Sequence, residues 1–202
     1  MPCNGSASFR ALDSSDGNIS PLETLAINCL VSTLQPMAIF EIGTFDGRTT
    51  LNMAANIPEG AKVYTLDLPR SKAVSTRLML EPDDSLYINM ELRSLRFEGT
   101  EYAEKIVRLT GDSATFDFSP YFGKMDLVFV DGAHSYDYVR NDSDIAFKLL
   151  RGEGGIIIWH DYAIWPGVTR YLNELLSRSM DGLRTISGTS LAILMRGHQS
   201  LK

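Results

Sequence analysis

The stretch Ile39-Phe-Glu-Ile-Gly-Thr-Phe-Asp-Gly-Arg-Thr-Thr50 decides the fold of this chain. A short apolar run ends in Glu41-Ile-Gly43, turns through Phe45 and Asp46 to Gly47, and continues into a segment that is compatible with a helix. We therefore predict a strand, a glycine turn and a helix start. Glycine lacks a Cβ and tolerates positive φ, so a ligand can approach the backbone of such a turn.

This turn differs from the dinucleotide-binding fingerprint. Its spacing is Gly43-x-x-x-Gly47, and Phe45 stands where G-x-G-x-x-G requires a second glycine. The carboxylate of Glu41, just before the turn, suits a ligand with hydroxyl or ammonium groups better than a pyrophosphate. Taken alone, the turn is equally compatible with a ligand site and with an ordinary connection between a strand and a helix.

The bulk composition predicts one globular domain over residues 1–202. A net charge of −6 provides no general attraction for nucleic acid or an anionic membrane, so we expect neither as a partner. The two cysteines, Cys3 and Cys29, form no disulfide framework and no Cys-x-x-Cys pair, which favours a cytoplasmic location. No apolar run reaches the ~18 residues of a membrane span. Residues 1–19 are polar and predict a flexible arm, or alternatively a flap on the substrate side.

Apolar runs of strand length alternate with helical patterns along the chain. The runs are apolar almost throughout, which is typical of strands buried on both faces of a parallel sheet. They predict strands over 38–42, 63–66, 106–109, 127–130 and 156–159. Helices are predicted from Pro21 to Pro36, over 49–55, from Tyr136 to a C-cap at Gly152, and over 168–176.

The end of the chain predicts a different arrangement. Residues 183–187 and 191–195 form two strand patterns joined by Gly188-Thr-Ser190, which indicates an antiparallel hairpin. The fold class is therefore α/β, a doubly wound and mostly parallel sheet closed by a C-terminal hairpin. Residues 69–104 are too long for an ordinary connection and predict an insertion, either a lid over the substrate or a surface decoration.

A carboxylate follows or ends each of the five predicted parallel strands. Ligands of open α/β sheets bind at the carboxyl ends of the strands, so these groups should meet at one edge. They are Glu41, Asp67, Asp112, Asp131 and Asp161. Asp67 is placed to accept paired hydrogen bonds from two ribose hydroxyls. Each carboxylate, taken singly, also suits a turn or a helix cap.

Histidines and aromatic residues add to this edge. Asp131, His160 and Asp161 form a set of hard ligands suited to Mg²⁺ or Mn²⁺, although the carboxylates could also bind ligand or cap helices without metal. His134 has an unperturbed pKa suited to proton abstraction, or it simply bonds its own loop. Three aromatic residues surround the last strand end, where they could wall a pocket or belong to the core: Trp159, Tyr162 and Trp165. We favour the core for Trp159.

The order of these motifs resembles the class I S-adenosylmethionine-dependent methyltransferases. Glu-Ile-Gly-Thr-x-x-Gly-x-Thr, the strand ending in Asp67, Gly-Asp-Ser, Val-Asp-Gly-Ala-His and His-Asp-Tyr occur in that order over about residues 37–176. The first motif is similar to that of cation-dependent catechol and caffeoyl-coenzyme A O-methyltransferases. Asp-Gly-x-His-Ser-Tyr, Gly-Gly-x-Ile and Pro-Gly-Val are closer to a bacterial branch that methylates sugars and macrolides. The resemblance implies the Rossmann-like methyltransferase fold with seven strands.

The resemblance also implies roles for individual residues. The methionine side of the cofactor would meet the first motif, the ribose Asp67, and the adenine the Gly-Asp-Ser motif. Asp131 would contribute to the cofactor pocket, to a metal site with His160 and Asp161, and to catalysis beside the general base His134. The other cofactor-binding positions are Glu41, Gly43, Thr44, Gly47, Asp112 and Ser113.

Three departures from these families stand out, and the first two leave the third metal ligand, and with it the metal, open. Tyr162 stands where the catechol branch has Asn, the sugar branch can carry an acidic residue in place of His160, and His134 replaces a catechol-branch Lys. The implied reaction is methyl transfer from S-adenosylmethionine to a hydroxyl oxygen of a small molecule or sugar, assisted by Mg²⁺ or Mn²⁺, in a dimer or larger assembly.

Three other functions remain as hypotheses. One is a metal-independent O- or N-methyltransferase with His134 as the sole base, and another is a non-catalytic protein that binds S-adenosylmethionine. A nicotinamide oxidoreductase is disfavoured by Phe45 and by the terminal hairpin.

Overall fold

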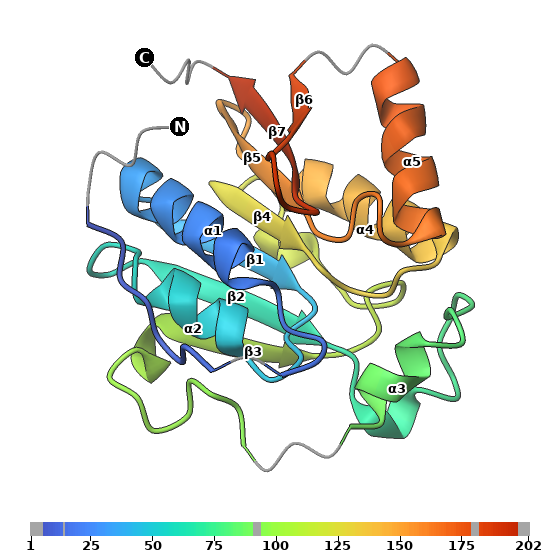
Figure 1. Cartoon of the computed structure of the whole chain (residues 1–202), viewed down its shortest axis with the longest axis horizontal. Helices are drawn as coiled ribbons and strands as arrows, with labels where there is room; N and C mark the ends of the chain where they lie inside the picture. Colours follow the sequence, from blue (N-terminus) through green and yellow to red (C-terminus); the bar gives the residue numbers. More distant parts are fainter. Residues whose placement is uncertain (1–5, 14, 91–93, 179–181, 198–202) are drawn as a thin grey trace.

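The computed structural model describes residues 6–13, 15–90, 94–178 and 182–197, and a seven-stranded sheet forms its centre (Figure 1). The sheet order is β3-β2-β1-β4-β5-β7-β6. The strands are β1 Ala38–Ile42, β2 Lys62–Asp67, β3 Ile106–Thr110, β4 Leu127–Val130, β5 Gly154–Trp159, β6 Leu183–Thr185 and β7 Ala192–Gly197. Strands β1 to β5 are parallel, whereas β7 runs antiparallel to both β5 and β6. The predicted fold class is confirmed.

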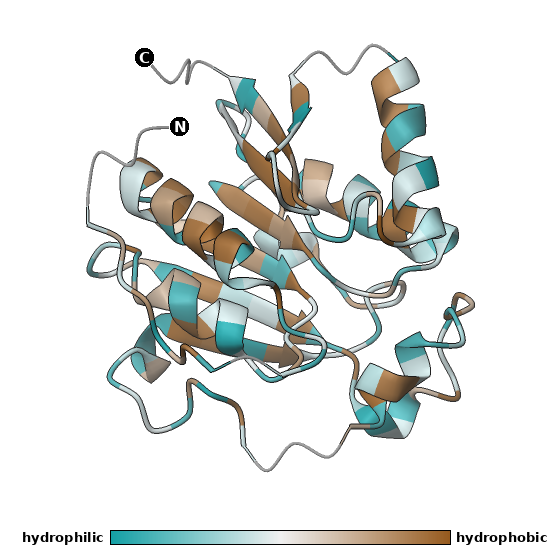
Figure 2. Ribbon diagram, in the orientation of Figure 1, coloured by the Kyte–Doolittle hydropathy of each residue, from teal (hydrophilic) through white to brown (hydrophobic). Residues whose placement is uncertain are grey.

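Helices cover both faces of the sheet, with α1 and α2 on one side and α4 and α5 on the other (Figure 1). Their bounds are α1 Pro21–Leu34, α2 Arg48–Ala54, α4 Tyr136–Leu149 and α5 Pro166–Ser177. Short 3₁₀ turns span Arg70–Lys72, Ala103–Lys105 and Ser119–Tyr121. Strand β1 shows how the two cores form, since Phe40 packs in the cluster beneath α4 and α5 and Ile39 in the cluster beneath α1 and α2. Figure 2 shows the central strand β4 as hydrophobic along its length, as expected for burial on both faces.

Local chemistry explains where the helices begin and end. Ser20 caps α1 in a reciprocal capping box with Glu23. Gly47 precedes α2 in the left-handed region, with φ of 79°. Helix α4 ends at Leu149, so the predicted C-cap at Gly152 is wrong. The reason is that Leu150 is already extended, is buried, and forms a parallel bridge with Met125.

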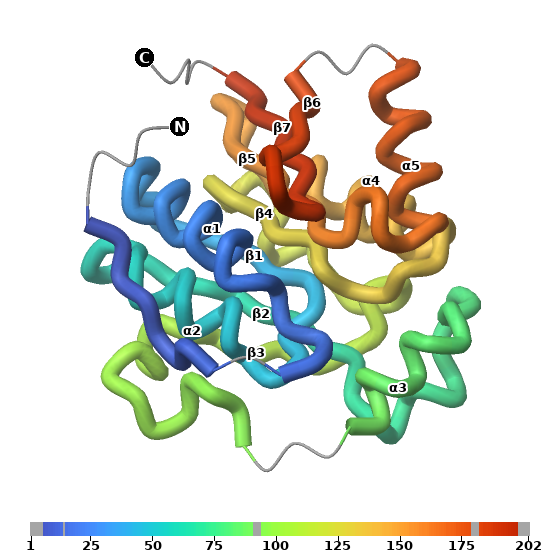
Figure 3. Tube along the Cα trace, in the orientation of Figure 1, coloured from blue at the N-terminus to red at the C-terminus, as the bar shows by residue number. Residues whose placement is uncertain are grey.

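The N-terminal segment that we predict to be flexible lies across α2 in the described residues (Figure 3). The Ser8 N–H donates to Asn56 Oδ1 over 2.7 Å, and the Arg10 N–H donates to Asn52 Oδ1 over 3.0 Å. Arg48 Nε donates to the Ala11 carbonyl over 2.9 Å. These contacts attach the described part of the segment to the domain, whereas residues 1–5 and 14 of the predicted arm lie outside the described residues.

The insertion over residues 69–104 divides into two described parts. The first carries helix α3, Asp84–Ile88, which lies beyond the carboxyl ends of the strands (Figure 1). The second returns along the domain, where Leu95 and Phe97 pack against Leu51 of α2. Among the residues that the structure describes, no helix has the length and apolar character needed to cross a bilayer.

Candidate active site

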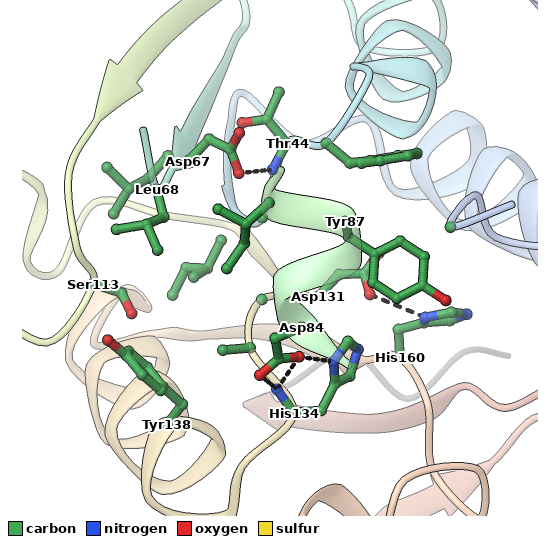
Figure 4. Close-up of a pocket in the computed structure, with 18 of the residues that line it drawn as sticks. Thr44, Asp67, Leu68, Asp84, Tyr87, Ser113, Asp131, His134, Tyr138 and His160 are labelled. Atoms are coloured by element: carbon green, nitrogen blue, oxygen red, sulfur yellow. Dashed lines mark hydrogen bonds and ion pairs between the residues drawn. The ribbon is translucent and has the colours of Figure 1, made fainter. Parts of the chain in front are cut away.

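A cavity of about 560 Å³ opens at the carboxyl ends of the parallel strands. It is bounded by the glycine turn after β1, by α3 of the insertion, and by the loops after β2, β3, β4 and β5 (Figure 4). Most of the site residues predicted from the sequence line this one cavity: Gly43, Thr44, Asp67, Asp112, Ser113, Asp131, His134, His160 and Asp161. The strand-end arrangement therefore brings them together as expected for an open α/β sheet.

Gly43 is the point where the turn after β1 meets the end of β4. Its φ is 99°, and a Cβ built there would lie 1.9 Å from the Asp131 carbonyl oxygen. No side chain can be accommodated, so the backbone itself forms the cavity wall. Beside it, the Thr44 N–H donates to Asp67 Oδ1 over 3.3 Å, which holds the carboxylate at the end of β2.

Two predicted cofactor residues, Glu41 and Gly47, are not among the residues that line the cavity. Gly47 packs beneath Phe97, which a Cβ would approach to 2.7 Å. Glu41 is fully buried below the turn, where its Oε2 accepts hydrogen bonds from Thr50 and Thr65. Both residues therefore support the turn from beneath instead of facing the cavity.

Burial raises the pKa of Glu41 to about 8, against the lowering effect of the Thr50 and Thr65 hydrogen bonds. The folded protein thus holds this proton at a pH where the unfolded chain, with a value of 4.5, has lost it. The contribution of Glu41 to the free energy of unfolding is therefore fully present at low pH and is lost as the pH rises towards 8. We expect the free energy of unfolding to fall by up to about 1.4 kcal/mol per pH unit between about pH 5 and 8.

The replacement Glu41→Gln should remove this slope, because the amide is neutral at every pH. Denaturant unfolding at several pH values measures it, with exposed Glu101→Gln as the matched control. The control should keep the wild-type slope. Equal slopes in Glu41→Gln and wild type would show that the buried carboxyl is not the source.

Asp112 and Ser113 line the cavity beyond the end of β3. The Asp112 carboxylate accepts hydrogen bonds from Tyr138 Oη over 2.9 Å, from the Ala114 N–H over 2.9 Å, and from the Arg77 N–H over 2.7 Å. These three donors hold the carboxylate in place, so Asp112 braces this part of the cavity wall. It ties the insertion, through Arg77, to the wall of the cavity.

Asp131, His160 and Asp161 offer ligand atoms that all lie within 4.8 Å of one another. His160 Nδ1 is 3.0 Å from Asp131 Oδ1 and 3.2 Å from Asp161 Oδ2. This nitrogen is nevertheless buried without an aligned hydrogen bond to any described residue. Two hard carboxylate oxygens and one imidazole nitrogen thus face a common point, a donor set that fits a divalent cation such as Mg²⁺ or Mn²⁺.

The surroundings of His160 and Asp161 hold this cluster in place. Burial alone would lower the pKa of His160, but Asp131, Asp161 and Glu23 raise it far above its ordinary value. Glu23 Oε2 lies 3.4 Å from His160 Nε2, and Glu23 Oε1 accepts from the Ser190 N–H over 2.8 Å. Asp161 has φ of 64°, an unusual backbone state of the kind that clusters at functional sites. The start of α1 and the hairpin turn therefore both support the cluster.

His134 lies between the carboxylates of Asp161 and Asp84, the second of which Figure 4 shows beside the ring. Its Nδ1 is 2.5 Å from Asp84 Oδ1, and its Nε2 is 2.8 Å from Asp161 Oδ2. The ring stacks on Trp165 with 4.3 Å between centroids. Burial tends to lower the pKa of His134, but the hydrogen bonds to Asp161 and Asp84 outweigh it and raise the value to about 9. The two carboxylates therefore favour the protonated form of the His134 ring at neutral pH.

The sequence patterns did not identify Glu23 and Asp84 as residues of the site, although they contact His160 and His134. Glu23 is explained in the sequence by its capping box, and Asp84 lies in a polar break of the insertion, so neither pattern indicates a site.

Trp159 belongs to the core, as favoured from the sequence, and its Nε1 donates to Ser143. Trp165 lines the cavity.

Comparison with known proteins defines the class to which this chain belongs. The chain belongs to the family of the methyltransferase domain, whose model matches residues 40–162. It is similar to catechol O-methyltransferase B of Danio rerio, with 27% identity over 161 residues, which are 77% of this chain and 53% of that protein. It is also similar to caffeoyl-CoA O-methyltransferase of Stellaria longipes, with 28% identity over 153 residues, covering 73% and 55%. The chain spans about half the length of these curated relatives.

A solved structure shares the fold. The O-methyltransferase TomG from Streptomyces achromogenes, determined in complex with SAM, superposes with a TM-score of 0.63 over 90% of this chain and 83% of that one. The sequence identity is 23%, so this similarity establishes the common architecture. The resemblance noted from the motifs is thereby confirmed at the level of the family and the fold.

Proposed function

We propose that this chain transfers the methyl group of S-adenosylmethionine to a hydroxyl oxygen of a small molecule or sugar, with a divalent cation at the acceptor. The observation that carries this proposal is the placement of His134 against the Asp131–His160–Asp161 cluster, within the cavity that Gly43 and Asp67 also line. Family membership and the named O-methyltransferase relatives support the same reaction.

The cofactor would lie along the ends of β1, β2 and β3. The bare backbone at Gly43 allows the methionine part to approach closely, and Asp67 would accept hydrogen bonds from the two ribose hydroxyls. Ser113 would border the adenine. The methyl-bearing sulfonium is positively charged, so the carboxylates of the cavity favour its binding.

Asp131, His160 and Asp161 would hold the cation, which, when bound, lowers the pKa of the acceptor hydroxyl. The chain's own residues then orient the acceptor oxygen in line with the methyl group, and alignment of this kind can contribute about 7 kcal/mol or more to lowering the barrier. In the transfer, the S–CH₃ bond breaks and the O–CH₃ bond forms. Neutral S-adenosylhomocysteine leaves, and the hydroxyl proton passes to His134.

Nε2 of His134 is the atom suited to take that proton. Nδ1 is held by Asp84, whereas Nε2 faces the Asp131–His160–Asp161 cluster through Asp161. His134 must first release its Nε2 proton, since the hydrogen bonds to Asp161 and Asp84 outweigh burial and raise its pKa to about 9. The positive charge of the sulfonium lowers that pKa when cofactor binds, because like charges disfavour the protonated form.

The acceptor end of the cavity combines apolar walls with negative charge. Phe45, Tyr87, Ile164 and Trp165 line it, while the two arginines among the described lining residues belong to the β2 and β3 side. Burial raises the pKa of Tyr87, and the negative charges of four nearby carboxylates raise it further: Asp16, Asp161, Asp83 and Asp84. We therefore favour a neutral or cationic acceptor with an apolar body over an anionic one.

Methyl transfer to a panel of catechol-type aromatic diols and sugars, each with Mg²⁺ and with excess chelator, tests the function. We expect transfer that requires Mg²⁺ and falls by about 10²–10⁴-fold in His134→Ala. Full activity in chelator would instead favour the metal-independent reaction with His134 as the sole base. Tight cofactor binding together with a fully active His134→Ala variant would remove His134 from the mechanism.

A further inference from the structure

Asp84 is the one buried residue of α3, with 3% of its surface exposed in a helix that otherwise faces solvent or the cavity. Its Oδ1 lies 2.5 Å from His134 Nδ1, and its Oδ2 accepts the Glu81 N–H over 2.8 Å. The His134 N–H also points at the carboxylate, 3.4 Å from each oxygen. Burying a carboxylate is costly unless it is partnered, and here the partners are one imidazole and two backbone N–H groups.

This contact decides which nitrogen of His134 is free for chemistry. A carboxylate cannot donate when ionised, so Nδ1 must carry a proton towards Asp84. The exchangeable position is then Nε2. Because the same ring stacks on Trp165, both its plane and its orientation are fixed.

Asp84 belongs to the segment that roofs the cavity. Tyr87, one turn further along α3, packs edge-on against Phe45 with 6.2 Å between ring centroids. It also covers Gly17 of the N-terminal segment, where an added Cβ would approach the Tyr87 ring to 2.9 Å. Docking of α3 through Tyr87 therefore delivers the carboxylate of Asp84 to His134 at the same time (Figure 4).

We propose that Asp84 is a positioning residue, which makes the orientation of the base His134 depend on the docking of α3 over the cavity. This inference rests on the proposed function for its kinetic consequence, and on the contact alone for its structural one. It explains why the described part of a lid-like insertion carries a single buried acid. It also links closure of the cavity to assembly of the site, so that water is excluded when the base is in place.

The variant Asp84→Asn tests the proposal, with Asp83→Asn as the control because Asp83 is adjacent and exposed. In Asp84→Asn the oxygen is needed by the Glu81 N–H, so the amide nitrogen takes the position of Oδ1 and donates to His134 Nδ1. We expect kcat to fall by about 10–100-fold with the affinity for S-adenosylhomocysteine unchanged. Asp83→Asn should behave as wild type, and Asp84→Glu should recover part of the rate.

Nitrogen-15 NMR of the His134 ring provides a readout that needs no activity. We expect a protonated Nδ1 in the wild type and in Asp83→Asn, and an unprotonated Nδ1 in Asp84→Asn. An unchanged Nδ1 signal, or a kcat within about twofold of wild type in Asp84→Asn, would overturn the proposal. If the wild type transfers no methyl group to any acceptor, the proposed function fails, while the ring signal still decides the role of Asp84.

Discussion

The replacement Asp161→Asn is expected to lower methyl transfer by about 10³-fold or more, equivalent to about 4 kcal/mol of barrier. Asp161 Oδ2 contacts both the candidate cation ligand His160 and the candidate base His134. It lies 3.2 Å from His160 Nδ1 and 2.8 Å from His134 Nε2. Removing its charge weakens the cation site and the orientation of the base together. Asn is the suitable replacement, since it tolerates the left-handed backbone at φ of 64°.

Steady-state kinetics and calorimetry measure this effect separately from binding. We expect Asp161→Asn to bind S-adenosylhomocysteine within about threefold of wild type, because the loss concerns the transfer step. Asp137→Asn, an exposed acid at the start of α4, is the control and should retain full activity. A fully active Asp161→Asn variant would show that neither a metal nor His134 depends on this carboxylate.

The replacement Gly43→Ala should abolish cofactor binding and destabilise the fold by about 3 kcal/mol or more. The added methyl would meet the Asp131 carbonyl oxygen at 1.9 Å, at a φ of 99° that alanine rarely adopts. Relief of this contact requires the ends of β1 and β4 to separate, where the Asp131 N–H donates to the Ile42 carbonyl over 2.9 Å. The cavity wall would then lose its shape.

Gly60→Ala is a matched control for this prediction. Gly60 also has positive φ, 77°, but a Cβ there meets nothing within 4 Å. Its cost should therefore be the backbone strain alone, about 1 kcal/mol, with cofactor binding intact. Chemical denaturation and calorimetry compare the two variants. Similar stability losses in both would show that the approach of Gly43 to Asp131 is not a constraint.

The sequence was sufficient for the fold and for most of the cavity. Strands such as β4 are apolar throughout, which distinguishes a parallel sheet covered on both sides, and the order of a parallel sheet then places every strand end at one edge. Asp131, His160 and Asp161 could be grouped in advance for that reason. Their joint placement needs no knowledge of the loops.

The parts that could not be predicted depend on contacts between distant segments. Asp84 and His134 are 50 residues apart, and Glu23 and His160 are 137 apart, with no periodic pattern linking either pair. Glu41 shows a different limit. Its position before the turn indicated a ligand, but the alternation of side chains along β1 directs it beneath the turn towards Thr50 of α2.

Calorimetric titration of S-adenosylhomocysteine, first with Mg²⁺ and then with chelator, tests the central claim that one cavity holds both cofactor and cation. We expect one S-adenosylhomocysteine per chain in both conditions, and a separate Mg²⁺ site whose affinity increases when cofactor is bound. An absent Mg²⁺ site would leave His134 as the sole base. No binding of S-adenosylhomocysteine in either condition would contradict the account.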